Sequence, residues 1–211
     1  SDPENPVQLD SLPYNGLARD VFVKGNYAFV DSVWGGLQAF DVSNATNIVR
    51  VGGYDTPGYA VASFVDEDDY AYVADRHAGL QILDVIDPFA VTLAGSLDTP
   101  GSATALAKSG RYIFVADNTS GVQVVDVFRP SQAKILKQIA TQGEALDIQI
   151  LSNRAYVASG WGGINVLDIS VPTNTVSMGF STLGFGYGYG AGAQAVSLVN
   201  NLAFLACGTQ G

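Results

Sequence analysis

Leu80-Gln81-Ile82-Leu83-Asp84-Val85 is a short apolar run that ends in Asp-Val, and the chain contains four runs that end in Asp-Val or, in the last, Asp-Ile. The other three are Leu37-Gln38-Ala39-Phe40-Asp41-Val42, Val122-Gln123-Val124-Val125-Asp126-Val127 and Ile164-Asn165-Val166-Leu167-Asp168-Ile169. A glycine precedes each run directly, and the closing aspartates stand at 41, 84, 126 and 168. The successive aspartates are thus 42 or 43 residues apart, and a repeat of this length is typical of arrays of similar structural units.

Three further segments repeat with the same period. A Tyr-Ala-Phe-Val type of segment lies upstream of each run, at 27–30, 70–73, 112–115 and 155–157, and again at 202–205. A second apolar segment precedes it, and a more polar one separates the units, as at 6–12, 48–54 and 135–139. All are short, rich in Val, Ile, Tyr and Phe, and bounded by Gly, Asn, Asp or Pro, which is typical of β-strands. Four strands in each repeat indicate a propeller blade.

The sequence therefore predicts an all-β protein, a single β-propeller of four-stranded antiparallel blades over residues 1–211. The repeats run over approximately 1–42, 43–85, 86–127, 128–169 and 170–211, with the last blade incomplete. The strand with small residues, such as 18–23, is expected innermost, followed by the Tyr strand and the Asp-Val strand. The polar strand is expected outermost, because edge strands tolerate proline. Residues 6–12 would then be an outer strand that helps to close the last blade, and the sequence would be a fragment of a longer chain.

Composition excludes several classes of function. The chain is 47% hydrophobic and 14% charged, which indicates a folded protein. A formal charge of −10 argues against nucleic acid or an anionic membrane as the partner. One cysteine and one histidine rule out an internal disulfide and a histidine-rich metal centre. No apolar run is long enough to insert in a membrane, and no cofactor or metal is predicted.

The repeated Asp-Val runs, with Tyr72-Val73-Ala74-Asp75 and Phe114-Val115-Ala116-Asp117 upstream, resemble the LVIVD repeat, whose name spells the consensus of the third strand. The resemblance covers essentially the whole chain, although Ala206-Cys207 replaces Ala-Asp in the last unit. Members of this family are mostly predicted secreted or surface proteins of bacteria and archaea, and are taken to form propellers. The resemblance implies an extracellular, periplasmic or cell-surface location in a prokaryote. It supplies no catalytic residues.

The loops between the second and third strands vary most, and all five should lie on one face of the propeller. They contain the candidate binding residues, which are Trp34, Arg76, His77, Asn118 and Trp161. Aromatic residues and Arg dominate binding hot spots, which favours a ligand or partner surface. A second interpretation stays open, in which each Trp caps the gap between two blades and His77 is an ordinary surface histidine.

The Gly-aromatic stretch 184–192 presents three further candidate binding residues, Phe185, Tyr187 and Tyr189. Aromatic rings on a glycine-rich backbone suit a binding platform, since they combine apolar area with a polar tip. A long connector whose rings pack on the adjacent blade explains the same pattern equally well.

Charged residues on the innermost strands are expected to line the channel: Arg19, Asp20 and Asp147. Two carboxylates there suit metal binding or acid–base chemistry. Solvated channel residues, with Arg19 paired to Asp20, are the alternative. The acidic run Asp66-Glu67-Asp68-Asp69 supplies oxygen ligands for Ca²⁺ but lacks the spacing of a calcium loop, so a solvated turn is predicted.

These observations predict a non-enzymatic secreted or cell-surface scaffold that binds a protein or a surface glycan. Two alternatives remain open. The first is a structural subunit of a larger extracellular or membrane-associated assembly. The second is a propeller-type lyase or glycoside-acting enzyme that works at the channel mouth with Asp20, Asp147 and Arg19.

Overall fold

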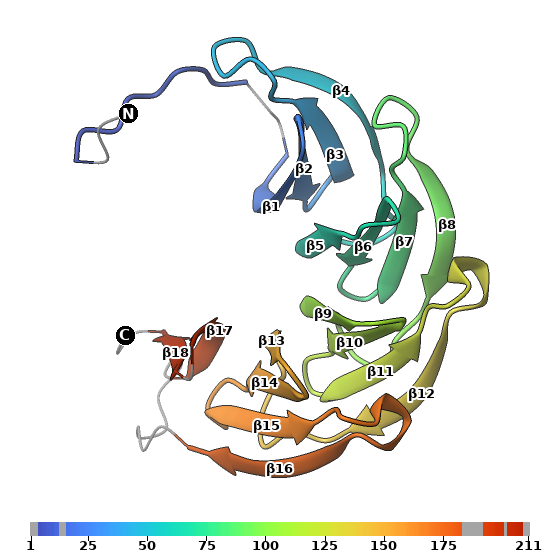
Figure 1. The fold of residues 1–211 in the computed structure, drawn as a ribbon, viewed down its shortest axis with the longest axis vertical. Helices are drawn as coiled ribbons and strands as arrows, with labels where there is room; N and C mark the ends of the chain where they lie inside the picture. Colours follow the sequence, from blue (N-terminus) through green and yellow to red (C-terminus); the bar gives the residue numbers. More distant parts are fainter. Residues whose placement is uncertain (1–3, 13–15, 183–191, 201, 209–211) are drawn as a thin grey trace.

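The computed structural model describes residues 4–12, 16–182, 192–200 and 202–208, and they form antiparallel sheets arranged as blades along an arc (Figure 1). The innermost strand of each blade contacts the innermost strand of the next. Two short 3-10 turns, Pro130–Gln132 (η1) and Pro172–Asn174 (η2), are the only helical elements in these ranges. The predicted all-β propeller architecture is confirmed.

The blades are numbered in chain order. Blade 1 holds β1 (Ala18–Lys24), β2 (Tyr27–Ser32), β3 (Gly36–Asp41) and β4 (Val49–Tyr54). Blade 2 holds β5 (Ala62–Val65), β6 (Tyr70–Ala74), β7 (Leu80–Asp84) and β8 (Thr92–Leu97). Blade 3 holds β9 (Ala105–Ser109), β10 (Tyr112–Ala116), β11 (Val122–Asp126) and β12 (Lys134–Ile139). Blade 4 holds β13 (Asp147–Leu151), β14 (Arg154–Ala158), β15 (Ile164–Asp168) and β16 (Val176–Ser181), and blade 5 holds β17 (Ala193–Val199) and β18 (Leu202–Cys207).

The order of strands within a blade is the predicted one, from the small-residue strand at the inner edge to the polar strand at the outer edge. Each outer strand pairs with the Asp-Val strand that precedes it in the chain, as in Asp41↔Val49. A sheet therefore runs from its inner strand to the following outer strand, for example over 18–54. The β3–β4 ladder shifts register between Ala39 and Phe40, and the other complete blades shift at the equivalent position.

The core lies between successive blades. Leu80, Ile82 and Leu83 of β7 are fully buried although they are not alternate residues of the strand. They face opposite sides of the sheet, and each side is covered by a neighbouring blade. This explains why the third strands are continuous apolar runs.

The glycine before each Asp-Val run has a backbone reason. Gly79 has a φ of 69°, and a Cβ there would overlap the backbone oxygen of Leu97. Gly36, Gly121 and Gly163 also have positive φ. A residue with a side chain strongly disfavours such a conformation, so only glycine starts this strand without strain.

The prediction of an outer strand at 6–12 is wrong, because these residues pair with no strand and extend away from the blades in Figure 1. Blade 5 has only β17 and β18 within the described ranges, so no third strand is present there to pair with an outer one. Across the described ranges, no helix is long and apolar enough to cross a membrane.

Candidate functional site

One end of the propeller gathers the variable loops, and we call it the loop face. It carries the loops β2–β3, β6–β7, β10–β11 and β14–β15, which all leave equivalent second strands. The linkers that run from each outer strand to the next inner strand reach the same end, because neighbouring strands are antiparallel. Trp34, Arg76, His77, Asn118 and Trp161 lie on these loops, as predicted.

Both indole side chains of the loop face are open to solvent. Trp34 is 68% exposed and Trp161 is 67% exposed. The interpretation that each Trp caps a gap between blades is therefore wrong. Trp34 belongs to blade 1 and Trp161 to blade 4, so the two rings stand on separate parts of the loop face.

The backbones of Arg76 and Asn118 have a structural role that the sequence did not indicate. The backbone of both residues adopts the left-handed conformation, with φ of 51° and 52°. Ala103 donates its amide to the Arg76 carbonyl at 3.0 Å, and Asn118 donates its own amide to the Ala145 carbonyl at 3.1 Å. Each loop thus pairs with the linker that enters the next blade. The side chain of Asn118 also accepts the Thr119 amide at 2.8 Å.

A shallow pocket of about 320 Å³ lies beside His77, between blades 1 and 2. Its lining combines the aromatic ring of Tyr54 with polar groups, among them Gln81, Ser96 and Asp98. His77 itself is exposed. The pocket therefore offers an aromatic wall and several hydrogen-bonding groups at the loop face.

Asp75 does not orient His77, although the two are close in sequence. Its carboxylate accepts a hydrogen bond from the Thr56 hydroxyl at 2.7 Å and from the Gly58 amide at 2.8 Å. Asp117 accepts the same pair of bonds from Thr99 and Gly101, at 2.6 and 2.9 Å. Both aspartates are fully buried. The aspartate of the Ala-Asp motif thus holds the Thr-Pro-Gly linker that enters its own blade.

The channel residues do not form a free carboxylate pair. Asp147 accepts the Val196 amide at 2.8 Å and the Ile148 amide at 2.8 Å, so it links β13 to β17. Burial raises the pKa of Asp147, the two amides lower it, and the charge of Asp20 adds a smaller increase. Asp20 is exposed and accepts the Val21 amide.

Arg19 forms no ion pair with Asp20 in the portion that the structure describes. Its charge acts instead on Arg76, whose pKa is lowered by burial and, to a smaller extent, by Arg19. Asp147 thus ties two inner strands together, whereas Arg19 and Arg76 are near enough for their like charges to repel each other.

The prediction of a solvated turn at Asp66–Asp69 is wrong for Asp66. The Lys108 ammonium lies 2.5 Å from one carboxylate oxygen of Asp66, and the Asp68 and Tyr70 amides bind the other. Lys24 donates to Asp69 at 2.6 Å and to the Asp66 carbonyl at 2.5 Å. Charges from three successive blades meet at this turn, which an acidic run alone could not reveal.

The sequence also predicts no metal and offers the Gly-aromatic stretch 184–192 as a candidate binding platform. Within the described ranges, no three His, Cys, Asp or Glu side chains gather in a way that could hold a metal ion. Phe185, Tyr187 and Tyr189 lie outside the described residues.

The fold resembles solved propellers. The chain has a TM-score of 0.67 and 14% identity to the computationally designed protein Ika8, over 90% of this chain and 55% of that one. The designed protein Ika4 has a TM-score of 0.61 and 15% identity to this chain, over 79% of this chain and 99% of Ika4. The β-propeller domain of Cps50 (Swd1) from Myceliophteria thermophila has a TM-score of 0.60 and 8% identity, over 78% of this chain and 59% of that domain's chain. The chain thus spans about half the length of Ika8, and these likenesses concern the fold alone.

No curated protein matches the sequence. The LVIVD repeat matches residues 15–56, 59–99, 100–141 and 142–181. These four matches cover most of the chain and contain the four complete blades. The protein belongs to the LVIVD-repeat family.

Proposed function

We propose that this β-propeller is a non-enzymatic scaffold, secreted or held at the cell surface, whose loop face binds another protein or a surface glycan. The exposure of Trp34 and Trp161 carries the proposal. An indole that stays in water forgoes the stabilisation that its large apolar area would give if buried. Exposed aromatic residues on loops held by a rigid scaffold are typical of binding surfaces.

The loop face is well suited to present these side chains. The β6–β7, β10–β11 and β14–β15 loops are fixed by backbone bridges to the linker into the next blade, so a partner would meet them pre-formed, with a small ordering cost. The pocket lined by Tyr54, His77 and Asp98 adds polar specificity to the loop face. The extracellular or cell-surface location rests on the family to which the chain belongs, and cell fractionation with an antibody tests it.

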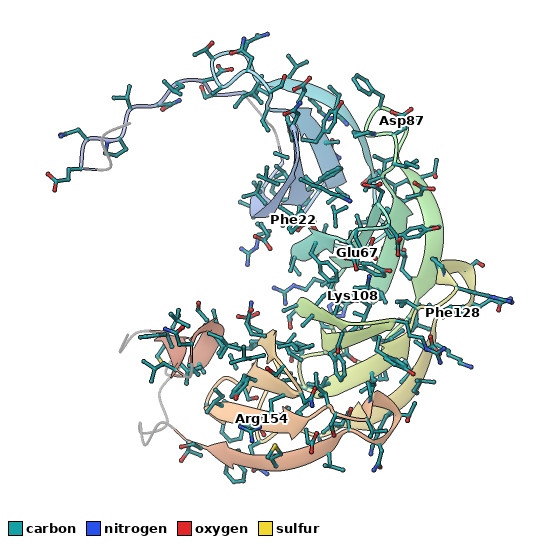
Figure 2. The ribbon with its side chains drawn as sticks, viewed as in Figure 1. Phe22, Glu67, Asp87, Lys108, Phe128 and Arg154 are labelled. Atoms are coloured by element: carbon teal, nitrogen blue, oxygen red, sulfur yellow. The ribbon has the colours of Figure 1, made fainter. Side chains whose placement is uncertain are left out.

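Replacing Trp34 or Trp161 by alanine is expected to weaken partner binding by roughly tenfold or more for each ring, the range of interface hot spots. The fold should survive, because both rings are mostly exposed. The measurement is binding to a glycan array and to protein captured from the medium and envelope of the producing organism. Phe128→Ala is the matched control, since Phe128 is 68% exposed on the outer rim, away from the loop face (Figure 2). Unchanged binding in both Trp variants would exclude the loop face.

The exposed outer strand of blade 4 supports a second proposal, that the protein is a structural subunit of a larger assembly. All six residues of β16 are exposed, among them Val176, Met178 and Phe180. An apolar row of this kind is typical of an interaction surface. Sedimentation of the wild type and of Met178→Lys tests whether this strand mediates assembly, because a lysine would break such a contact.

A further inference from the structure

The interface between blades 1 and 2 differs from the later interfaces at one register position. At each later interface, an alanine at the end of a second strand shares an apolar cluster with an aliphatic residue of the next inner strand. The pairs are Ala74 with Leu106, Ala116 with Ile148, and Ala158 with Val196. The strand registers place Asp31 and Ser63 at the equivalent positions of the first interface. A polar pair thus stands where the chain otherwise packs an apolar one.

Asp31 and Ser63 are both buried, at 0% and 9% exposure. Neither carboxylate oxygen of Asp31 has a hydrogen-bond partner, and neither does the Ser63 hydroxyl. Ser63 lies near enough to lower the pKa of Asp31 but lacks hydrogen-bonding geometry. The charged groups that act on Asp31 in the described part of the chain are both acidic, Asp20 on β1 and Asp75 after β6. Burial of a carboxylate without a partner favours its neutral form.

The same end of this interface lacks a backbone connection that the later interfaces have. Arg76, Asn118 and Gly160 each pair with the linker into the next blade, and each has positive φ. Val33 occupies the equivalent place in blade 1, and no such bridge forms there within the described ranges. A β-branched residue strongly disfavours positive φ, which explains the difference. At the loop-face end, the β2–β3 loop is therefore joined to the next blade without the backbone bridge of the later interfaces.

We propose that the first blade interface is a pH-sensitive joint, in which protonated Asp31 keeps the loop-face end of β2 docked on β5 and ionised Asp31 releases it. Lys24 ties the opposite end of the interface to Asp69 and to the Asp66 carbonyl. Release is therefore confined to the loop face, where Trp34 follows Asp31 by three residues. The inference does not rest on the proposed binding function.

The direction of the response follows from the state of Asp31. Burial raises its pKa to about 7, with smaller increases from Asp20 and Asp75. A carboxyl whose pKa is raised in the docked state favours docking at low pH. This contribution declines as pH rises from the ordinary carboxyl range, and it is lost once pH passes through about 7.

Hydrogen exchange of the β2–β3 hairpin tests the joint, after correction for the intrinsic pH dependence of exchange. Protection there is expected to fall about tenfold between about pH 6 and pH 8.5, by proton linkage. The equivalent β6–β7 hairpin is the internal control and should not change. Asp31→Ala/Ser63→Leu installs the Ala–Leu pair of the second interface and should remove the pH response. Asp31→Ala alone should also remove it, whether or not the larger leucine packs well.

His77 requires a separate control because histidine titrates in the same pH range. His77→Gln should leave the response of the β2–β3 hairpin intact. The proposal is overturned if wild-type protection does not depend on pH, or if the dependence persists without Asp31. It is also overturned if millimolar CaCl₂ restores protection at high pH in the wild type but not in Asp31→Ala, since the site would then be a cation site.

Discussion

Asp117→Ala is expected to lower the free energy of unfolding by about 3 kcal/mol, because a buried hydroxyl and a partly buried amide would lose their acceptor. The Thr99 hydroxyl and the Gly101 amide both donate to this carboxylate, at 2.6 and 2.9 Å. Asp117 is fully buried and Thr99 is 6% exposed, so water cannot easily replace the acceptor. Urea unfolding at neutral pH, with the slope checked for constancy, measures the change.

Two further variants separate the hydrogen bonds from the charge. Asp117→Asn keeps an oxygen for Thr99 but turns an amide donor toward Gly101, so an intermediate loss is expected. In the pair Thr99→Val and Asp117→Ala, the double variant should lose less than the sum of the single losses, because both remove one interaction. Glu144→Ala, an exposed acid on the linker from blade 3 to blade 4, is the control and should change stability by less than about 0.5 kcal/mol. A similarly small effect of Asp117→Ala would contradict the role of this aspartate as a structural clamp.

The blades could be predicted from the sequence because their causes are local. The period, the glycine before each Asp-Val run and the strand composition all act within one repeat. Strand order also followed, since small residues such as Ala62 and Ala105 suit the crowded axis and proline suits an edge. The segment 6–12 shows the limit, because its strand character depends on a neighbouring strand and not on its own residues.

Contacts between segments that are distant along the chain could not be predicted from the repeat pattern. Asp75 and Asp117 stand where a second strand meets its variable loop, while their partners lie in the Thr-Pro-Gly linkers 16 to 19 residues upstream. The Ala-Asp motif and the Thr-Pro-Gly linker recur together in the same two repeats, and this joint recurrence is the signal in the sequence that could have revealed their contact. Asp31 gives no signal in the sequence, because it lies next to a loop that varies between the repeats. The position of Asp31 stands out only by comparison with the equivalent positions at the other interfaces, which are all alanine.

Charged contacts between blades are the least predictable from a repeat, since they need not occupy equivalent positions. Asp66 and Lys108 are 42 residues apart and lie in blades 2 and 3. Their side chains are 2% and 19% exposed, whereas those of the neighbouring Asp69 and Lys24 are 40% and 33% exposed. Figure 2 shows Lys108 toward the inner side of the blades. The same turn therefore holds one mostly buried ion pair and one half-exposed pair.

Lys108→Met is expected to cost about 2–3 kcal/mol, because it leaves the Asp66 carboxylate buried without its cation. The value lies below that of a fully buried pair, since the ammonium partly reaches water. Lys24→Met removes the same type of group from the half-exposed pair and should cost no more than about 1 kcal/mol. Urea unfolding of the two variants at neutral pH gives the comparison. Equal losses would mean that burial of Asp66 adds nothing to the pair.

Acid unfolding gives an independent check on the same ion pair. Burial raises the pKa of Asp66, but hydrogen bonds from Lys108 and Tyr70 and the charge of Lys108 outweigh it and hold the pKa below its usual value. A lowered carboxyl pKa gives stability that is present above the ordinary carboxyl range and is lost as pH falls from that range through the lowered pKa. In Lys108→Met the hydrogen bond and the charge that lower the pKa of Asp66 are lost. Burial, which raises that pKa, remains, so the pKa of Asp66 should rise. Acidification should then narrow the stability gap between this variant and the wild type, whereas a constant gap would mean that Lys108 acts through packing alone.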